Sequence, residues 1–84
     1  MEKTKTISER IAQIAVEVNP AVQGQLHNEH LVTKGILDSL DLLSLIDKLE
    51  GEFNIPIDPE DVLAENFESI ESMTRLVSRK VDAI

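Results

Sequence analysis

The sequence predicts an all-α fold, a small four-helix bundle of three longer helices and one short helix, with a long loop between the first and second helices. Three observations support this prediction. Apolar residues recur with the period of a helix in residues 6–18, 38–53 and 69–81. No segment alternates between apolar and polar residues for long enough to form a sheet. The 84 residues suit one domain spanning residues 1–84.

The first helix is expected from Thr6 to Val18, because its apolar residues share one helical face. These residues are Ile7, Ile11, Ile14, Ala15 and Val18. Thr6 followed three positions later by Glu9 is the pattern of a capping box. The helix is expected to end at Asn19, because the residue before a proline disfavours the helical region.

Residues 19–38 show no clean period and predict the long loop between the first two longer helices. A loop of this length needs contacts with the core if it belongs to a compact domain. Apolar residues at intervals are expected to supply them: Val22, Leu26, Leu31, Ile36 and Leu37. Gly35 suits a turn immediately before the next helix.

Residues 38–53 form the strongest helical segment. On a helical wheel, one group of apolar residues falls in a single arc and predicts an ordinary inward stripe. This stripe consists of Leu42, Leu45, Ile46, Leu49 and Phe53. Leu40 and Leu43 fall on the opposite side, together with Asp47. Single apolar residues on a surface are common, but because these two adjoin Ser39, we interpret them as a docking patch.

The remaining elements follow from capping residues. Residues 54–57 are expected to form an extended connector. Asp58 suits the cap of a short helix that has Pro59 in its first turn and ends near Glu65. Ser69 suits the cap of the last helix. The inward residues of that helix are expected to be Ile70, Met73, Leu76, Val77 and Val81.

The charge balance excludes several classes of partner. The chain has 16 acidic and 8 basic residues, a formal net charge of −8. Nucleic-acid binding relies on Lys and Arg against phosphates, so we expect no nucleic-acid partner, and no anionic membrane surface for the same reason. Residues 38–71 hold eleven acids and one base, which either steers basic partners to this segment or only aids solubility.

Composition narrows the chemistry further. The absence of cysteine excludes disulfides, thiolate zinc sites and cysteine nucleophiles. The first residues are polar and lead into no long apolar stretch, so we expect a cytoplasmic protein without membrane insertion. His27 and His30 lie close in sequence, but no further ligands accompany them, so we expect no metal site. Neighbouring carboxylates such as Glu50 and Glu52 are interpreted as a charged face rather than an acid–base pair.

The most informative stretch is residues 35–41. Asp38 occupies the position of a helix N-cap and Asp41 the third helical position. Ser39 then lies in the first turn, where free backbone N–H groups and the helix dipole favour a phosphate on its hydroxyl. From these residues alone, an ordinary helix start is the preferred explanation, because Asp-Ser is common at helix starts. A hydrolytic role for Ser39 is disfavoured, because a nucleophilic serine needs a base and an oxyanion hole.

The tetrapeptide Asp38-Ser39-Leu40-Asp41, at the head of an amphipathic helix in a short acidic chain, resembles the acyl and peptidyl carrier proteins. The resemblance extends over about residues 5–82. Residues 45–55 resemble the second helix of that family and its exit, and residues 58–61 the start of its third helix. Residues 66–70 resemble the segment that leads into its last helix.

The resemblance implies that Ser39, preceded by Asp38, carries 4′-phosphopantetheine from coenzyme A through a phosphodiester. The thiol at the end of this arm would hold acyl or aminoacyl cargo as a thioester. The protein would then be a substrate of a phosphopantetheinyl transferase and not an enzyme. It would be a monomer that serves a loading ligase and downstream acyl-processing enzymes in a fatty-acid, polyketide, nonribosomal-peptide or other specialised pathway.

The resemblance also implies a partner-binding face made of Leu40, Asp41, Leu43, Asp47 and Glu50. On this face the fatty-acid carriers usually have acids where this chain has Ser44 and Gly51, and an apolar residue where it has Asp47. These departures indicate a dedicated carrier rather than the general one. The alternative is an unmodified acidic helical adaptor that binds its partner through Leu40 and Leu43; modification by phosphopantetheine distinguishes the two.

Overall fold

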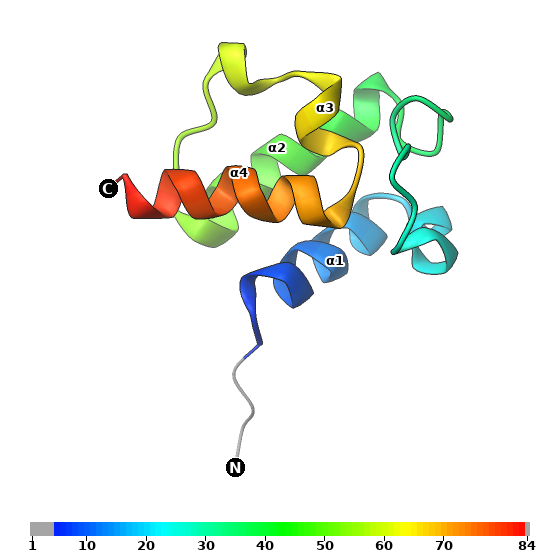
Figure 1. Cartoon of the computed structure of the whole chain (residues 1–84), viewed down its shortest axis with the longest axis horizontal. Helices are drawn as coiled ribbons and strands as arrows, with labels where there is room; N and C mark the ends of the chain where they lie inside the picture. The colour runs from blue at the N-terminus through cyan, green and yellow to red at the C-terminus, as the bar shows by residue number, and fades with distance from the viewer. Residues whose placement is uncertain (1–4, 84) are drawn as a thin grey trace.

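Helices account for most of residues 5–83, which are the residues described by the computed structural model (Figure 1). The α-helices are α1 (Ile7–Val18), α2 (Ser39–Phe53), α3 (Ala64–Phe67) and α4 (Ile70–Asp82). Two short 3₁₀ helices, η1 (Pro20–Gln25) and η2 (Pro59–Asp61), lie in the connections. This part of the chain contains no strand. The predicted all-α class, with three longer helices and a long connection between the first two, is confirmed.

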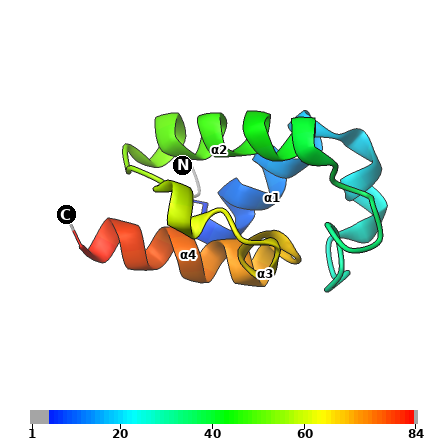
Figure 2. The same ribbon diagram turned by 90° about the horizontal axis from the view of Figure 1, so that it is seen from above.

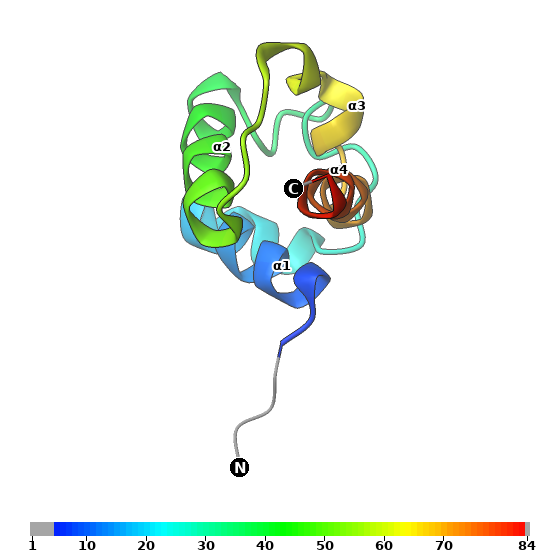
Figure 3. The same cartoon turned by 90° about the vertical axis from the view of Figure 1, so that its left-hand side faces the viewer.

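The three longer helices enclose the core. Helix α1 packs against both α2 and α4, and it runs in roughly the opposite direction to them (Figures 1 and 2). Figure 3 looks along α4. In this view α2, α1 and α4 surround the interior, and the connector from α2 to α3 crosses the side that these helices leave open. The start of α2, the end of α1 and the connection between them therefore lie at one end of the bundle (Figure 2).

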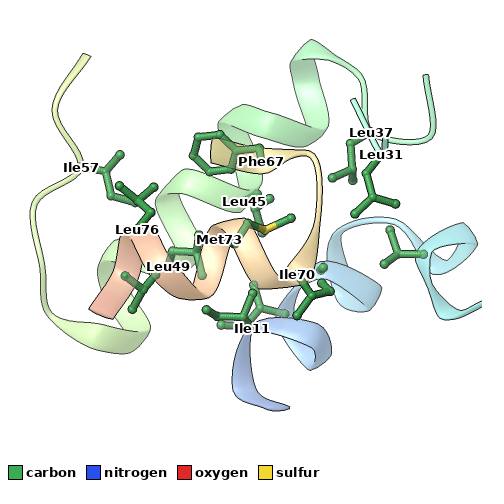
Figure 4. Close-up of a cluster of buried hydrophobic side chains, with 14 of the residues drawn as sticks. Ile11, Leu31, Leu37, Leu45, Leu49, Ile57, Phe67, Ile70, Met73 and Leu76 are labelled. Atoms are coloured by element: carbon green, nitrogen blue, oxygen red, sulfur yellow. The ribbon is translucent and has the colours of Figure 1, made fainter. Parts of the chain in front are cut away.

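Buried side chains from every longer helix meet in this interior (Figure 4). Leu45 and Leu49 of α2 are fully buried, as are Ile11 of α1 and Leu76 of α4. Phe67 of α3 is also fully buried and is the largest of these side chains. Burying one such side chain stabilises the folded state by about 1.5–3 kcal/mol relative to leaving it exposed. The core thus fixes which face of each helix points inward.

Local capping residues set the starts of the longer helices as predicted. The hydroxyl of Thr6 accepts the N–H of Glu9 at 3.1 Å, and the carboxylate of Glu9 accepts the N–H of Thr6 at 2.9 Å. These bonds hold the pKa of the Glu9 carboxyl below its ordinary value. Ser69 caps α4 through a hydrogen bond from the N–H of Ser72 at 3.0 Å. Helix α2 ends at Asn54, whose φ of 54° is left-handed.

The connection between α1 and α2 is held to the core at the expected positions. Val22, Leu31 and Leu37 are buried, and Leu26 and Ile36 are partly buried against the core. The 3₁₀ helix η1 within this segment was not predicted. It begins because Pro20 occupies its first turn and the side chain of Asn19 accepts the N–H of Ala21.

Glu68, between α3 and α4, binds the connection between α1 and α2 through several hydrogen bonds. Its carboxylate accepts hydrogen bonds from the N–H of Val32 at 2.9 Å, the N–H of Thr33 at 3.0 Å, and the hydroxyl of Thr33. Its backbone carbonyl accepts the N–H of Leu31 at 2.9 Å. The hydroxyl of Thr33, followed by the backbone N–H groups, keeps the pKa of Glu68 below its ordinary value.

The single short helix predicted from Asp58 to Glu65 is wrong, because the chain forms η2 and α3 as separate turns. Between them, Val62 adopts φ −83° and ψ 71°, and the N–H of Leu63 donates to the carbonyl of Asp61 at 2.9 Å, as in an inverse γ-turn. Long-range contacts hold η2 against α4. Lys80 of α4 contacts the carboxylates of Asp58 at 3.0 Å and Asp61 at 2.5 Å.

One inward assignment needs correction. Val81 was expected to face inward but is 37% exposed, in the last turn of α4. Ile46 of the inward stripe of α2 is partly buried and packs against the core, as Leu42 and Phe53 do. The centre of the stripe is formed by Leu45 and Leu49.

We expect Leu→Ala to lower the free energy of unfolding much more on the buried face of α2 than on its exposed face. Leu45→Ala should lower the free energy of unfolding by about 2–5 kcal/mol, because it leaves a cavity in the core. Leu43→Ala, on the exposed face of the same helix, should change it by about 0.5 kcal/mol or less. Urea unfolding of the two variants measures both values. Similar losses for both leucines would contradict this orientation of α2.

The contacts of Glu68 predict an acid-sensitive contribution to stability. A lowered pKa in the folded state means that the carboxylate stabilises the fold fully above its unfolded pKa, and that this contribution is lost as the pH falls through the folded pKa. Glu68→Gln should therefore lower the melting temperature near neutral pH, and the difference from wild type should shrink below about pH 4.5. Glu65→Gln, at an exposed position of α3, is the control. A difference that is constant with pH would contradict this role for the charge.

Candidate functional site

A reciprocal pair of hydrogen bonds builds the first turn of α2. The carboxylate of Asp38, the N-cap, accepts the N–H of Asp41 at 2.8 Å. The carboxylate of Asp41 accepts the N–H of Asp38 at 3.1 Å. The carbonyl of Asp38 accepts the first helical hydrogen bond, from the N–H of Leu42 at 3.0 Å. The predicted cap is therefore present, and its two carboxylates bracket residues 39 and 40.

Ser39 is the first residue of α2, and it is exposed. Within residues 5–83 its hydroxyl hydrogen-bonds to no other protein group, whereas the neighbouring Asp38 and Asp41 side chains are both engaged. The N–H groups of Ser39 and Leu40 precede the first intrahelical bond, so they face the space beyond the helix end. An exposed alcohol at a helix N-terminus suits a covalently attached phosphate group, which such an end stabilises.

The residues ahead of Ser39 follow a tight path that positions this end of α2. Gly35 has a φ of 77°, a left-handed conformation that suits glycine, and its N–H donates to the carbonyl of Val32 at 3.0 Å. Leu37 is buried, and its N–H donates to the carbonyl of Leu31 at 2.9 Å. The chain is therefore anchored in the core two residues before Ser39.

Asn19, at the end of α1, also contributes to this region. Its side-chain NH₂ group donates to the carbonyl of Ile36 at 2.9 Å and to the carboxylate of Asp41 at 3.1 Å. Sequence reasoning identified Asn19 only as a helix end, because its partners lie 17 and 22 residues further along the chain. An Asn before a proline gives no sequence signal for contacts of this kind.

The outer face of α2 continues away from Ser39. Leu40 is 73% exposed and Leu43 is 66% exposed, which confirms the prediction that both point away from the core. Asp47, one of the residues expected to bind partners, is exposed as well. The exposed apolar side chains of Val62 and Leu63, in the turn between η2 and α3, were not identified from the sequence. Their exposure follows from the break between these two elements.

Two predicted partner-binding acids already have contacts within the protein. Asp41 is half-buried and accepts from Asp38 and Asn19. Glu50 is also half-buried, and its carboxylate accepts the N–H of Ile57 at 2.8 Å. Glu50 therefore ties α2 to the extended connector that follows it. Both acids still contribute negative charge to this side of the molecule, while their oxygens hold the protein's own backbone.

The remaining candidates from the sequence do not converge. His27 and His30 are exposed in the connection between α1 and α2. No group of three or more His, Cys, Asp or Glu side chains among the described residues is arranged to hold a metal ion. The carboxylate of Glu52 lies 2.6 Å from the guanidinium of Arg10 in a surface ion pair between α1 and α2. Glu50 and Glu52 thus serve different contacts rather than one acid–base site.

Comparison with known proteins adds a second line of evidence. Residues 9–77 match the family model described as phosphopantetheine attachment site. The chain belongs to this family, that of the acyl carrier proteins. It is also similar to the acyl carrier protein of Buchnera aphidicola subsp. Baizongia pistaciae (strain Bp), with 32% identity over 78 residues that cover 92% of this chain and 97% of that protein. No solved structure matches.

Membership of the acyl carrier family confirms two expectations from the sequence. The cofactor is covalently attached 4′-phosphopantetheine, and the family consists of carriers rather than catalysts. The match does not favour the alternative of an unmodified adaptor. The exposed hydroxyl of Ser39 and the helix end beside it are compatible with such a group. No helix in residues 5–83 is both long and apolar enough to cross a membrane.

Proposed function

We propose that Ser39 is the attachment residue and that the protein carries acyl or aminoacyl cargo as a thioester on the arm joined there. The main support is the position of Ser39, an exposed serine in the first turn of a capped helix, directly after Asp38. Asp38 supports the site by fixing this turn through its bond to Asp41. The arm supplies the thiol that the cysteine-free chain lacks.

Attachment requires one covalent step at Ser39. The hydroxyl oxygen forms a new bond to phosphorus, and the pyrophosphate bond of coenzyme A breaks to release the part that contains the adenosine. The proton of the hydroxyl must be removed as this bond forms, and no base contacts Ser39 in the described part of the chain. The base is therefore supplied by a phosphopantetheinyl transferase, and this protein is the substrate of that enzyme.

The outer face of α2 is the proposed contact surface for enzymes that act on the arm. Leu40 and Leu43 offer exposed apolar area beside Ser39, and Asp38 and Asp47 supply exposed negative charge. Such a surface suits partners with an apolar contact region rimmed by basic residues, because complementary charge aligns the two proteins during association. These partners include the transferase, a loading ligase and downstream acyl-processing enzymes.

We further propose that the protein is a monomeric, cytoplasmic carrier dedicated to one pathway. On the outer face of α2, Ser44 and Gly51 carry no charge, whereas Asp47 and Lys48 carry opposite charges. This arrangement differs from the run of acids with an apolar contact residue expected for a general fatty-acid carrier. An enzyme built for that pattern would have to desolvate Asp47, which weakens binding. A polyketide, aminoacyl or other specialised pathway is therefore proposed.

The attachment residue is tested by transfer of the arm in vitro. Incubation with coenzyme A and a broad-specificity phosphopantetheinyl transferase should add one arm to the wild type and none to Ser39→Ala, as measured by intact mass. Ser8→Ala is the control, because it removes an exposed serine from α1, away from the outer face of α2, and it should be modified like the wild type. An unmodified wild type, under conditions that modify a known carrier, would favour the adaptor function instead. Modification of Ser39→Ala would place the arm elsewhere.

The contact surface is tested at Leu43. Leu43→Asp should lower kcat/KM for loading by the cognate ligase about tenfold or more, because it places a charge in an apolar contact. The melting temperature should stay close to that of wild type, because the side chain is 66% exposed. Glu65→Gln, an exposed change on α3, is the control and should load normally. Normal loading of folded Leu43→Asp would show that the ligase contacts another face.

A further inference from the structure

We propose that Asn19 is a positioning residue for arm transfer: its side chain holds the first turn of α2, and therefore Ser39, in the geometry that the transferase requires. This inference rests on the proposed role of Ser39. It goes further by assigning a function to a residue at the end of α1 that is separated from Ser39 by the whole connection between the two helices.

The side chain of Asn19 joins three separate parts of the chain. Its carbonyl oxygen accepts the N–H of Ala21 at 3.0 Å, which fixes the start of η1. Its NH₂ group donates to the carbonyl of Ile36 at 2.9 Å and to the carboxylate of Asp41 at 3.1 Å. An asparagine side chain has one oxygen acceptor and two N–H donors. Both kinds of group are thus used, and they connect α1 and η1 to the residues on either side of Ser39.

These bonds restrain the turn around Ser39 from two directions. The oxygen of Asp41 that accepts from Asn19 also accepts the N–H of Asp38 and so closes the capping box. The bond to Ile36 fixes the backbone three residues before Ser39. Asn19 and its two bonds to Ile36 and Asp41 are partly buried, so water competes with them less than at an open surface. Without them, the cap of α2 would rest on local bonds alone.

The backbone of Asn19 is itself fixed, which makes its side chain a firm support. Its N–H donates to the carbonyl of Ala15 at 3.0 Å, and its carbonyl accepts the N–H of Val22 at 3.0 Å. Ala15 and Val22 are both fully buried. The start of α2 is thus anchored to the core through Asn19 and α1, in addition to the buried residues of α2 itself.

Loss of this support should affect the chemical step more than docking. A misplacement of a reacting atom by about 1 Å can lower a rate about 10²-fold. Leu43, the exposed leucine proposed to contact enzymes, lies one turn further along α2. Its orientation is set by the burial of Leu45 and Leu49 and does not depend on Asn19. A defect at Asn19 is therefore expected mainly in kcat.

The most selective variant is Asn19→Asp. It keeps the oxygen that accepts from Ala21, but it replaces the NH₂ group with an acceptor that faces the Asp41 carboxylate and the Ile36 carbonyl. With the broad-specificity transferase and coenzyme A, we expect kcat for arm transfer to fall about tenfold and KM for the carrier to change by less than about twofold.

Arg10→Gln is the matched control, because it breaks a contact between the same two helices at their other end. Arg10 bonds to the carboxylate of Glu52 at 2.6 Å, and its guanidinium lies 4.3 Å from the centre of the Phe53 ring. This variant should lose melting temperature but keep the wild-type kcat. A fall in kcat for both variants in proportion to their loss of melting temperature would overturn the inference, because it would indicate a purely structural effect.

A second variant separates loss of the support from the added charge. Asn19→Ser keeps an oxygen that can accept the N–H of Ala21, adds no charge, and has a side chain too short to reach Asp41. It should show the same loss of kcat as Asn19→Asp. A wild-type kcat for folded Asn19→Ser would overturn the inference, because the support would then be dispensable.

The outcomes separate this inference from the proposed function. If the wild type accepts an arm on Ser39 and Asn19→Asp is modified with the wild-type kcat, the role of Asn19 is contradicted but the proposed function is not. Wild type that accepts no arm would contradict the proposed function, and with it the role of Asn19 in arm transfer. A fall in kcat at unchanged KM for Asn19→Asp and Asn19→Ser, with a wild-type kcat for Arg10→Gln, supports both.

Discussion

The burial of Leu45 and Leu49 is the constraint on which the candidate site depends. Both leucines are fully buried where α2 meets the interior formed with α1 and α4. Because successive helical residues are about 100° apart, this burial fixes the rotation of the whole helix. Leu40 and Leu43 must then point outward, beside the exposed Ser39. The same apolar contacts that stabilise a small domain therefore also determine which surface it presents to enzymes.

The elements that the sequence predicted are those set by local interactions. The cap of α1 at Thr6, that of α2 at Asp38 and that of α4 at Ser69 each involve a partner three residues away, so the pattern is visible in the sequence. The break between η2 and α3 was missed for the opposite reason. Lys80, which contacts η2 beside this break, lies 22 residues beyond its partner Asp58, and no local pattern marks such a contact.

The candidate site divides in the same way. Asp38 and Ser39 were identified from a short motif and a resemblance, whereas Asn19 and Glu68 were not. Asn19 reaches Asp41 over 22 residues, and Glu68 reaches Val32 over 36. Both act on the long connection ahead of Ser39, where the sequence has no period to interpret. The position of Ser39 in the sequence is thus marked by a local motif, whereas the residues that hold its surroundings in place come close only in the folded chain.

The central claim is that Ser39 carries the arm in the protein as it exists in its host. The most direct measurement is the intact mass of the chain isolated from that host, followed by fragmentation to locate any modification. We expect one phosphopantetheine arm on Ser39, with or without cargo, and the mass of the cargo would then indicate the pathway. A chain isolated wholly without the arm, or with the arm on another residue, would contradict the account.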